Sequence, residues 1–145
     1  MKVVLQRVKN ASIKVNEKEI SKIRQGLLLF LGVGKGDSES QIDWLVNKII
    51  NLRIFEDEQG KMNKSLLDID GEILLVSQFT LYADCSKGRR PSFTQSENPE
   101  RANELYKTFG KKLAQNNVTI KYGIFGADMK VSLLNDGPVT IILER

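Results

Sequence analysis

Apolar residues recur at three- and four-residue steps in two stretches of the chain, and short β-rich runs bounded by turn residues fill most of the rest. The recurrence predicts two helices, each with one buried face. Ser38 is the expected N-cap of the first, which runs to Leu52; Asn98 caps the second, with Pro99 at its first position. The β-rich runs predict strands over residues 3–8, 12–15, 19–23, 27–33, 72–76, 118–122, 129–134 and 139–143.

These elements predict an α+β fold in which mixed or antiparallel sheets are layered with two main helices. No internal repeat, linker or low-complexity segment divides the chain, so we expect a single domain over residues 1–145. The first strands favour an antiparallel meander. Local signals alone make Asn-Asp-Gly-Pro, residues 135–138, a hairpin turn between the last two strands.

The chain contains no histidine and one cysteine, Cys85. The lack of histidine excludes Ser-His-Asp and Cys-His catalytic groups and the HExxH zinc motif. A single cysteine excludes an intramolecular disulfide and any cysteine-cluster metal site. We therefore expect neither a metal nor a cofactor, and a chemistry that relies on other groups.

Charge and hydropathy narrow the possible partners. Lysine and arginine outnumber acidic residues by 22 to 18, and the resulting net charge of +4 permits an anionic partner such as RNA without requiring one. No apolar run approaches the roughly 18–20 residues that cross a bilayer. The first residues lack the apolar core of a secretory signal. We expect a cytoplasmic protein with no membrane partner.

Two loops carry motifs that are open to more than one interpretation. The Gly32–Gly36 loop joins a strand to a helix, as in nucleotide-dependent enzymes with a dinucleotide site. Its third glycine falls one place early, which favours an ordinary connection. Arg89 and Arg90 lie in a predicted loop, where guanidinium groups suit phosphates and equally suit a solvated surface.

An apolar strand ends abruptly in hydroxyl and amide groups at residues 77–81, Ser-Gln-Phe-Thr-Leu. Such a strand end can line a pocket with hydrogen-bonding groups. It is equally typical of a strand that exits into a turn, because Ser and related polar residues are common there.

Four segments taken together resemble the D-aminoacyl-tRNA deacylase family, formerly called D-tyrosyl-tRNA deacylase: residues 1–8, 77–81, 88–93 and 135–140. Ser-Gln-x-x-Leu and Asn-x-Gly-Pro-x-Thr, about 55 residues apart in one small domain, form a specific pair, whereas either motif alone is weak. Length and motif order agree from end to end, so the resemblance implies one deacylase-like domain.

The resemblance implies a homodimeric hydrolase that cuts the ester between a D-amino acid, or glycine, and the terminal adenosine of tRNA. In this family the Gly-Pro dipeptide is cis and enters the active site of the other protomer, so Gly137 and Pro138 would act in trans. Main-chain atoms of Phe79 and Thr80 would hold the amino group of the substrate and line the reaction centre.

Further positions are implied to serve the same site. Arg7 corresponds to the residue that braces the Gly-Pro loop, and Met129 to one that packs near that loop. Ser77 and Gln78 belong to the strand-end motif. The arginine pair in the predicted loop is the expected contact to tRNA.

Without histidine, ester hydrolysis needs another proton acceptor. A vicinal ribose hydroxyl of the substrate could activate water, while backbone N–H groups of Phe79 and Thr80 stabilise the oxyanion. A nucleophilic Thr80 hydroxyl is the competing mechanism, although the sequence supplies no adjacent base. Carbonyls of Gly137 and Pro138 would crowd the side of the substrate α-carbon where an L side chain projects. L-aminoacyl esters would then be rejected, whereas glycyl esters would be cleaved.

The alternative function is a non-catalytic RNA-binding module. Its arginine loop and basic surplus would grip phosphates. It lacks the interleaved exposed aromatic residues that stack on bases.

Overall fold

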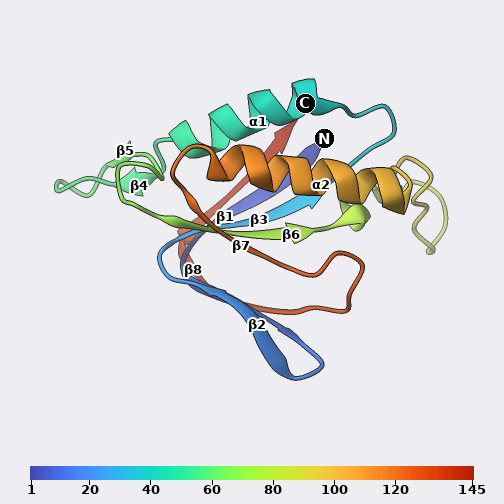
Figure 1. Cartoon of the computed structure of the whole chain (residues 1–145), viewed down its shortest axis with the longest axis horizontal. Helices are drawn as coiled ribbons and strands as arrows, with labels where there is room; N and C mark the ends of the chain where they lie inside the picture. The colour runs from blue at the N-terminus through green and yellow to red at the C-terminus, as the bar shows by residue number, and fades with distance from the viewer.

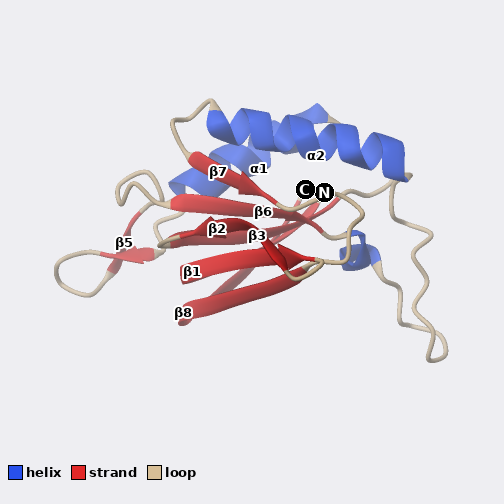
Figure 2. Ribbon diagram, turned by 60° about the horizontal axis from the view of Figure 1, so that its bottom comes forward, coloured by secondary structure: helices blue, strands red, loops and turns tan.

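In the computed structural model, which describes residues 1–145, two helices cover one face of a six-stranded mixed sheet, and a small two-stranded sheet lies beside it (Figure 1; Figure 2). The α+β fold with two main helices is therefore confirmed. The elements in chain order are β1 (Lys2–Val15), β2 (Lys18–Ile23), β3 (Gly26–Gly32), α1 (Glu39–Asn51), β4 (Phe55–Glu56), β5 (Met62–Lys64), β6 (Glu72–Ser77), the 3-10 helix η1 (Phe79–Tyr82), α2 (Pro99–Ala114), β7 (Thr119–Tyr122) and β8 (Lys130–Glu144).

Strand β1 organises the main sheet. It pairs antiparallel with β3 and β2 along one edge and with β8 along the other. Strand β6 adds parallel to β3, and β7 adds parallel to β6. The parallel pairing brings the end of β6 beside the end of β3, with Leu31 opposite Ser77. That corner of the sheet is where the polar strand-end motif begins.

Both helices begin where the sequence predicts. The Ser38 N–H donates to Gln41 Oε1 at 2.9 Å at the start of α1. Asn98 Oδ1 accepts from the Arg101 N–H at 3.0 Å, and Pro99 is the first residue of α2. These side chains satisfy backbone donors that a helix start leaves without partners.

The main core lies between the helices and the sheet. Leu5, Leu29 and Leu75 lie side by side on β1, β3 and β6 and are fully buried. The apolar faces of α1 and α2 cover them, in one cluster of 23 buried residues. Because side chains alternate across a sheet, Leu28 and Leu74 point to the opposite face, where they belong to a second cluster of seven.

Two strand predictions are wrong. Residues 3–8 and 12–15 belong to one strand, β1, because the chain reverses only at Asn16 and Glu17, which have positive φ. Residues 129–134 and 139–143 do not form a hairpin either. Gln6 pairs with Thr140 and Val8 with Asn135, so residues 136–139 bulge out of a continuous β8 opposite a single residue of β1.

Strand β8 is an edge of the sheet, since β1 is its only partner strand. None of its residues is buried. Leu134 and Ile142 are 56% and 71% exposed, respectively. A long edge strand with exposed aliphatic side chains is a typical surface for pairing with another chain. None of the helices has the length and apolar character needed to cross a membrane.

Candidate active site

The strand-end motif turns into η1 directly after β6. The Gln78 N–H donates to the Leu31 carbonyl at 2.8 Å, which ties the start of the turn to β3. The first backbone bond of the short helix runs from the Leu81 N–H to the Gln78 carbonyl at 3.3 Å. The N–H groups of Phe79 and Thr80 precede it and, like the first donors of any helix, have no acceptor inside it. The motif thus presents two adjacent backbone donors.

A cavity of about 280 Å³ opens beside this turn. Its walls come from the end of β6, from α2 and from the segment between β7 and β8. The lining residues are Leu31, Val33, Val76, Ser77, Gln78, Phe79, Ser96, Ala102, Tyr106, Phe125, Gly126, Ala127, Asp128, Met129 and Val131. The structure therefore brings Ser77, Gln78, Phe79 and Met129 together around one cavity, with Thr80 at its margin.

The Thr80 hydroxyl has one hydrogen-bond partner, the Gln78 side-chain amide, which donates to Thr80 Oγ1. No carboxylate or amine is bonded to this hydroxyl. Thr80 is exposed and is not among the residues that line the cavity. The geometry gives the hydroxyl no base, whereas the neighbouring Phe79 lines the cavity.

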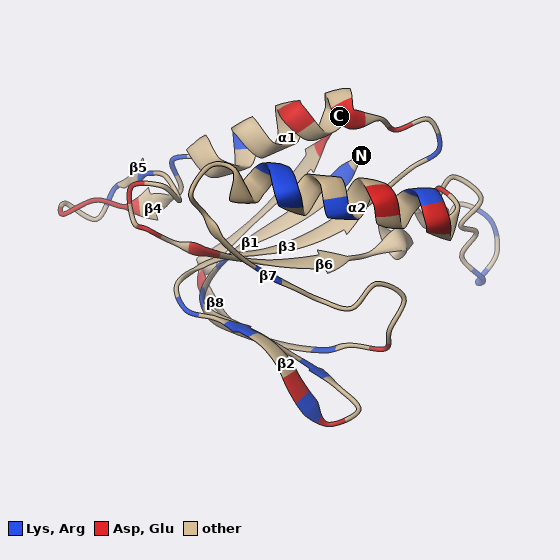
Figure 3. Cartoon of the chain, in the orientation of Figure 1, with Lys and Arg blue, Asp and Glu red and all other residues tan.

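Phe79 is 57% exposed and packs edge to face against Phe93, with ring centroids 5.0 Å apart. This contact fixes the long segment between η1 and α2 against the site. Arg89 and Arg90 lie at its exposed end, beyond the bridge that pairs Asp84 with Ser92. Neither arginine forms an ion pair within the chain, and the segment projects past the sheet as a basic loop (Figure 3).

The Gly-Pro motif forms the bulge in β8, and the Gly137–Pro138 peptide bond is cis. Both residues are exposed. The bulge is held from inside by Arg7, which is only 4% exposed. Arg7 Nε donates to the Asp136 carbonyl at 3.0 Å, and Arg7 also donates to the carbonyl of Ile54.

Side-chain contacts close the bulge further. The Val139 N–H donates to Asn135 Oδ1 at 3.2 Å, which bridges the two ends of the bulge. The Asp136 carboxylate lies 3.1 Å from Lys9 Nζ and 3.5 Å from Arg7 Nε. Charge and main-chain bonds together hold a projecting dipeptide in one orientation.

Within one chain the bulge and the cavity are separate. Arg7 pairs with Leu27 on β3, whereas Ser77 pairs with Leu31, a separation of four residues or roughly 13 Å. Neither Gly137 nor Pro138 lines the cavity. The bulge therefore does not contribute to the cavity of its own chain.

Met129 lines the cavity of its own chain and lies away from the Gly-Pro bulge of that chain. The reason is the length of β8: Val131 pairs with Ile13 but Asn135 pairs with Val8, five residues or roughly 17 Å along β1. Met129 lies beyond the Val131 end, so the sheet register separates it from the bulge of its own chain.

Sequence reasoning missed part of the cavity wall. Tyr106 belongs to the apolar stripe of α2, which predicts a core position, yet its ring lines the cavity while its hydroxyl donates to the Leu75 carbonyl at 2.8 Å. Burial and the nearby Tyr122 raise the pKa of Tyr106. The sequence around Phe125 and Asp128 has no pattern that indicates a cavity wall. The one local signal is Gly126 between them, whose φ of +76° marks a tight turn.

Comparisons with known proteins place these features in context. A family model described as "D-Tyr-tRNA(Tyr) deacylase" matches residues 4–144. A protein named "D-aminoacyl-tRNA deacylase" from Thermosipho melanesiensis is 58% identical over 145 residues, covering 99% of this chain and 97% of its own. One of the same name from Exiguobacterium sibiricum is 54% identical, and each chain covers 100% of the other.

Two solved structures share the fold. One, titled "c-Myc DNA Unwinding Element Binding Protein", has a TM-score of 0.94 and 44% identity, covering 100% of this chain and 99% of its own. The other, a probable eukaryotic D-amino acid tRNA deacylase, has a TM-score of 0.80 at 17% identity, covering 98% of this chain and 97% of its own. At that identity the second likeness supports the fold alone.

Proposed function

The chain belongs to the D-Tyr-tRNA(Tyr) deacylase family, and on that basis we propose that it hydrolyses the ester of D-aminoacyl-tRNA, releasing free D-amino acid and tRNA. Residues 1–145 act as one catalytic domain, in the cytoplasm where tRNA is used. The observation that carries the proposal is the pair of backbone donors at Phe79 and Thr80, which lies at the rim of a cavity without any histidine.

The two backbone N–H groups stabilise the oxyanion that forms when water adds to the ester carbonyl. Each donor of this kind contributes roughly 3–4 kcal/mol to transition-state stabilisation in measured enzymes. The bond from the carbonyl carbon to the ribose oxygen then breaks, and the proton from water ends on that ribose oxygen. The neighbouring ribose hydroxyl of the substrate positions and activates the water, because the cavity supplies no histidine.

A covalent path through Thr80 has less support. Its hydroxyl oxygen accepts from the Gln78 amide and contacts no group that could take its proton. A threonine hydroxyl without an adjacent base is a weak nucleophile. Gln78 orients this corner of the site, and Ser77 lines the cavity beside it.

Chiral selection is the task of the Gly137–Pro138 bulge acting in trans. Along β3, the register position beside the bulge lies roughly 13 Å from the position beside the cavity of the same chain. This separation supports a contribution of the bulge to a second protomer. Carbonyls of the bulge crowd the side of the α-carbon where an L side chain projects, so selection works by rejection. Glycine has no side chain to reject, and glycyl-tRNA is therefore a substrate.

The homodimer that this arrangement needs is supported by the edge strand. Strand β8 has no buried residue, and Ile142 is among the most exposed aliphatic side chains of the chain. A twofold contact through this strand would cover that surface. Met129 in the cavity of one protomer would then approach the bulge of the other.

The basic loop completes the substrate site. Phe93 fixes the loop against Phe79, and Arg89 and Arg90 have no internal ion pair. Their guanidinium groups suit the phosphates next to the terminal adenosine of tRNA.

Deacylation of D-tyrosyl-tRNA and L-tyrosyl-tRNA, measured side by side with and without a chelator, tests the proposed function. We expect free D-tyrosine to be released at catalytic protein concentrations, with L-tyrosyl-tRNA nearly untouched and no effect of the chelator. Glycyl-tRNA should be cleaved as well. The alternative, a non-catalytic RNA-binding module, predicts that the protein protects both esters from spontaneous hydrolysis.

A further inference from the structure

Gly32 and Gly34, two of the three glycines in the loop before α1, lie against η1. A Cβ added to Gly34 would stand 2.5 Å from the Tyr82 ring, and one added to Gly32 would stand 3.0 Å from Leu81 Cβ and 3.1 Å from the Gln78 carbonyl oxygen. A methyl group at Gly34 would displace the Tyr82 ring, and one at Gly32 would press on Leu81 Cβ and on the Gln78 carbonyl, which belongs to the backbone at the start of η1. These glycines are therefore explained by the close approach of η1, and not by a bound dinucleotide.

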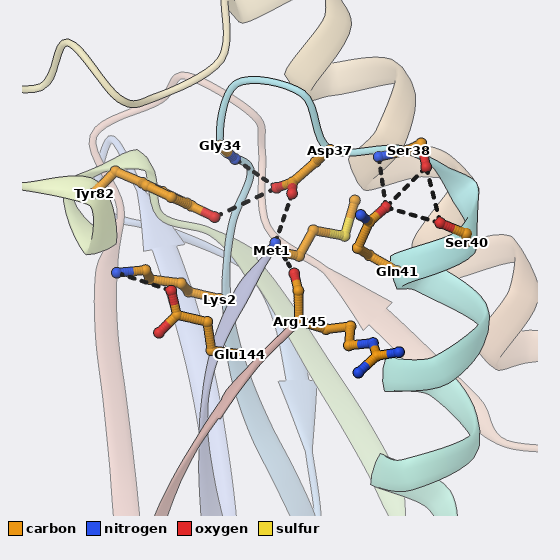
Figure 4. A network of polar contacts seen from close by, with 10 residues as sticks. All are labelled: Met1, Lys2, Gly34, Asp37, Ser38, Ser40, Gln41, Tyr82, Glu144 and Arg145. Atoms are coloured by element: carbon orange, nitrogen blue, oxygen red, sulfur yellow. Dashed lines mark hydrogen bonds and ion pairs between the residues drawn. The ribbon is translucent and has the colours of Figure 1, made fainter.

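Asp37 holds this glycine segment in place (Figure 4). Its Oδ2 accepts from the Gly34 N–H at 2.7 Å and lies 3.4 Å from the Tyr82 hydroxyl. Its Oδ1 accepts from the Met1 amino group at 2.7 Å, and the Asp37 side chain is only 10% exposed. One carboxylate thus contacts the loop, the end of η1 and the start of β1.

The same segment also binds residues 95–97, which include another lining residue of the cavity, Ser96. The Lys35 N–H donates to the Gln95 carbonyl, and the Glu97 N–H donates to the Val33 carbonyl, both at 3.0 Å. Gly34 forms a bridge with Ser96, which lines the cavity. Two walls of the site are therefore attached to one short segment.

We propose that Gly32, Gly34 and Asp37, here called the glycine seat, are positioning residues that fix the backbone donors of η1 relative to the cavity. The inference rests on the proposed deacylase function. Tyr82 transmits the contact: its ring lies on Gly34, and it is the last residue of η1. Displacement of the seat moves the oxyanion donors without removing any group that touches the substrate.

The test is Gly34→Ala, assayed with D-tyrosyl-tRNA. Because a misplacement of ~1 Å can cost ~100-fold in rate, a smaller shift of η1 should lower kcat by about tenfold. KM should stay within about twofold, since the groups that bind the tRNA phosphates are untouched. Gly32→Ala, with contacts of 3.0 to 3.3 Å, is the milder companion variant and should give a smaller loss of kcat.

A second substitution separates positioning from loss of stability. Tyr82→Leu removes the ring that lies on Gly34 and so breaks the same contact. It should lower kcat as Gly34→Ala does, and the double variant should lose no more than either single variant. Gly60→Ala is the control for a general loss of stability: its φ of +75° strains any side chain, and no atom lies within 4 Å of the added Cβ. It should lower the melting temperature and leave kcat unchanged.

The outcomes distinguish the two proposals. A wild-type chain without activity on D-tyrosyl-tRNA would overturn the proposed function. An active wild type whose kcat is unchanged by Gly34→Ala, or in which the losses from Gly34→Ala and Tyr82→Leu multiply in the double variant, would overturn the positioning role alone.

Discussion

The Nε atom of Arg7 donates a 3.0 Å hydrogen bond to the main-chain carbonyl of Asp136, immediately before Gly137. The same buried guanidinium donates to the Ile54 carbonyl, so it joins the β8 bulge to the segment that leads into β4. A planar group with several donors is suited to this, because one side chain serves two carbonyls in fixed directions.

Replacement of Arg7 by lysine should loosen the bulge. A lysine ammonium is a point charge on a flexible stem and cannot reproduce both bonds, and an unpartnered buried carbonyl costs about 1–3 kcal/mol. We expect a lower melting temperature and a reduced ratio of D- to L-tyrosyl-tRNA cleavage. Lys14→Ala, at an exposed position of β1 outside the bulge, is the control and should keep the ratio. An unchanged ratio in Arg7→Lys would contradict the bracing role.

Thr80→Ala should retain most of the activity. If the ribose hydroxyl of the substrate activates water and the backbone N–H at position 80 stabilises the oxyanion, loss of the side chain should change kcat by no more than about threefold, far below the ~100-fold effect of a lost oxyanion donor. Steady-state kinetics and intact-protein mass spectrometry during turnover check this. An acyl group found on Thr80, or an inactive variant that is still folded, would favour the covalent path.

Ile142→Glu should separate the proposed homodimer. A carboxylate on each of two facing β8 strands must lose its hydration without an opposite charge, which is strongly unfavourable. Sedimentation should show monomers, and these should lose discrimination between D- and L-tyrosyl-tRNA. Met62→Glu, at an exposed position on β5, should remain dimeric. A monomer that still discriminates would show that the bulge does not act in trans.

Loss of the arginine pair should weaken tRNA binding with little effect on chemistry. In Arg89→Ala with Arg90→Ala we expect a raised KM, a nearly unchanged kcat and a weaker dependence of KM on salt. The slope of log affinity against log salt should fall by about 0.7–0.9 for each lost phosphate contact. Lys61→Ala, on the turn between β4 and β5, should leave the slope as it is.

The sequence predicts the helices well because their signals are local. A capping side chain, a proline at the first helical position and the spacing of apolar residues all act within a few residues of Asn98. The strands depend on pairing between distant segments. The bulge at Gly137 and the continuous β8 arise from register with β1, which no window of the sequence contains.

The site, too, is only partly predictable from the sequence. The motif at Phe79 is recognisable as a strand end, but the cavity beside it also takes Tyr106 from a helix and Asp128 from a loop. The glycine seat was visible in the sequence only as an imperfect dinucleotide motif. Its purpose follows from the approach of Tyr82, about 50 residues away, which only the fold supplies.

The cavity wall contains just two ionisable side chains, Asp128 and Tyr106, and burial raises the pKa of Tyr106. The wall has no imidazole, the side chain whose ordinary pKa lies between pH 5 and pH 8. The α-amino group of the aminoacyl ester does titrate in that interval, so a bend in the rate profile there would report on the molecule being cleaved. In this arrangement the pH dependence of the cleavage rate in that interval comes from the α-amino group of the substrate.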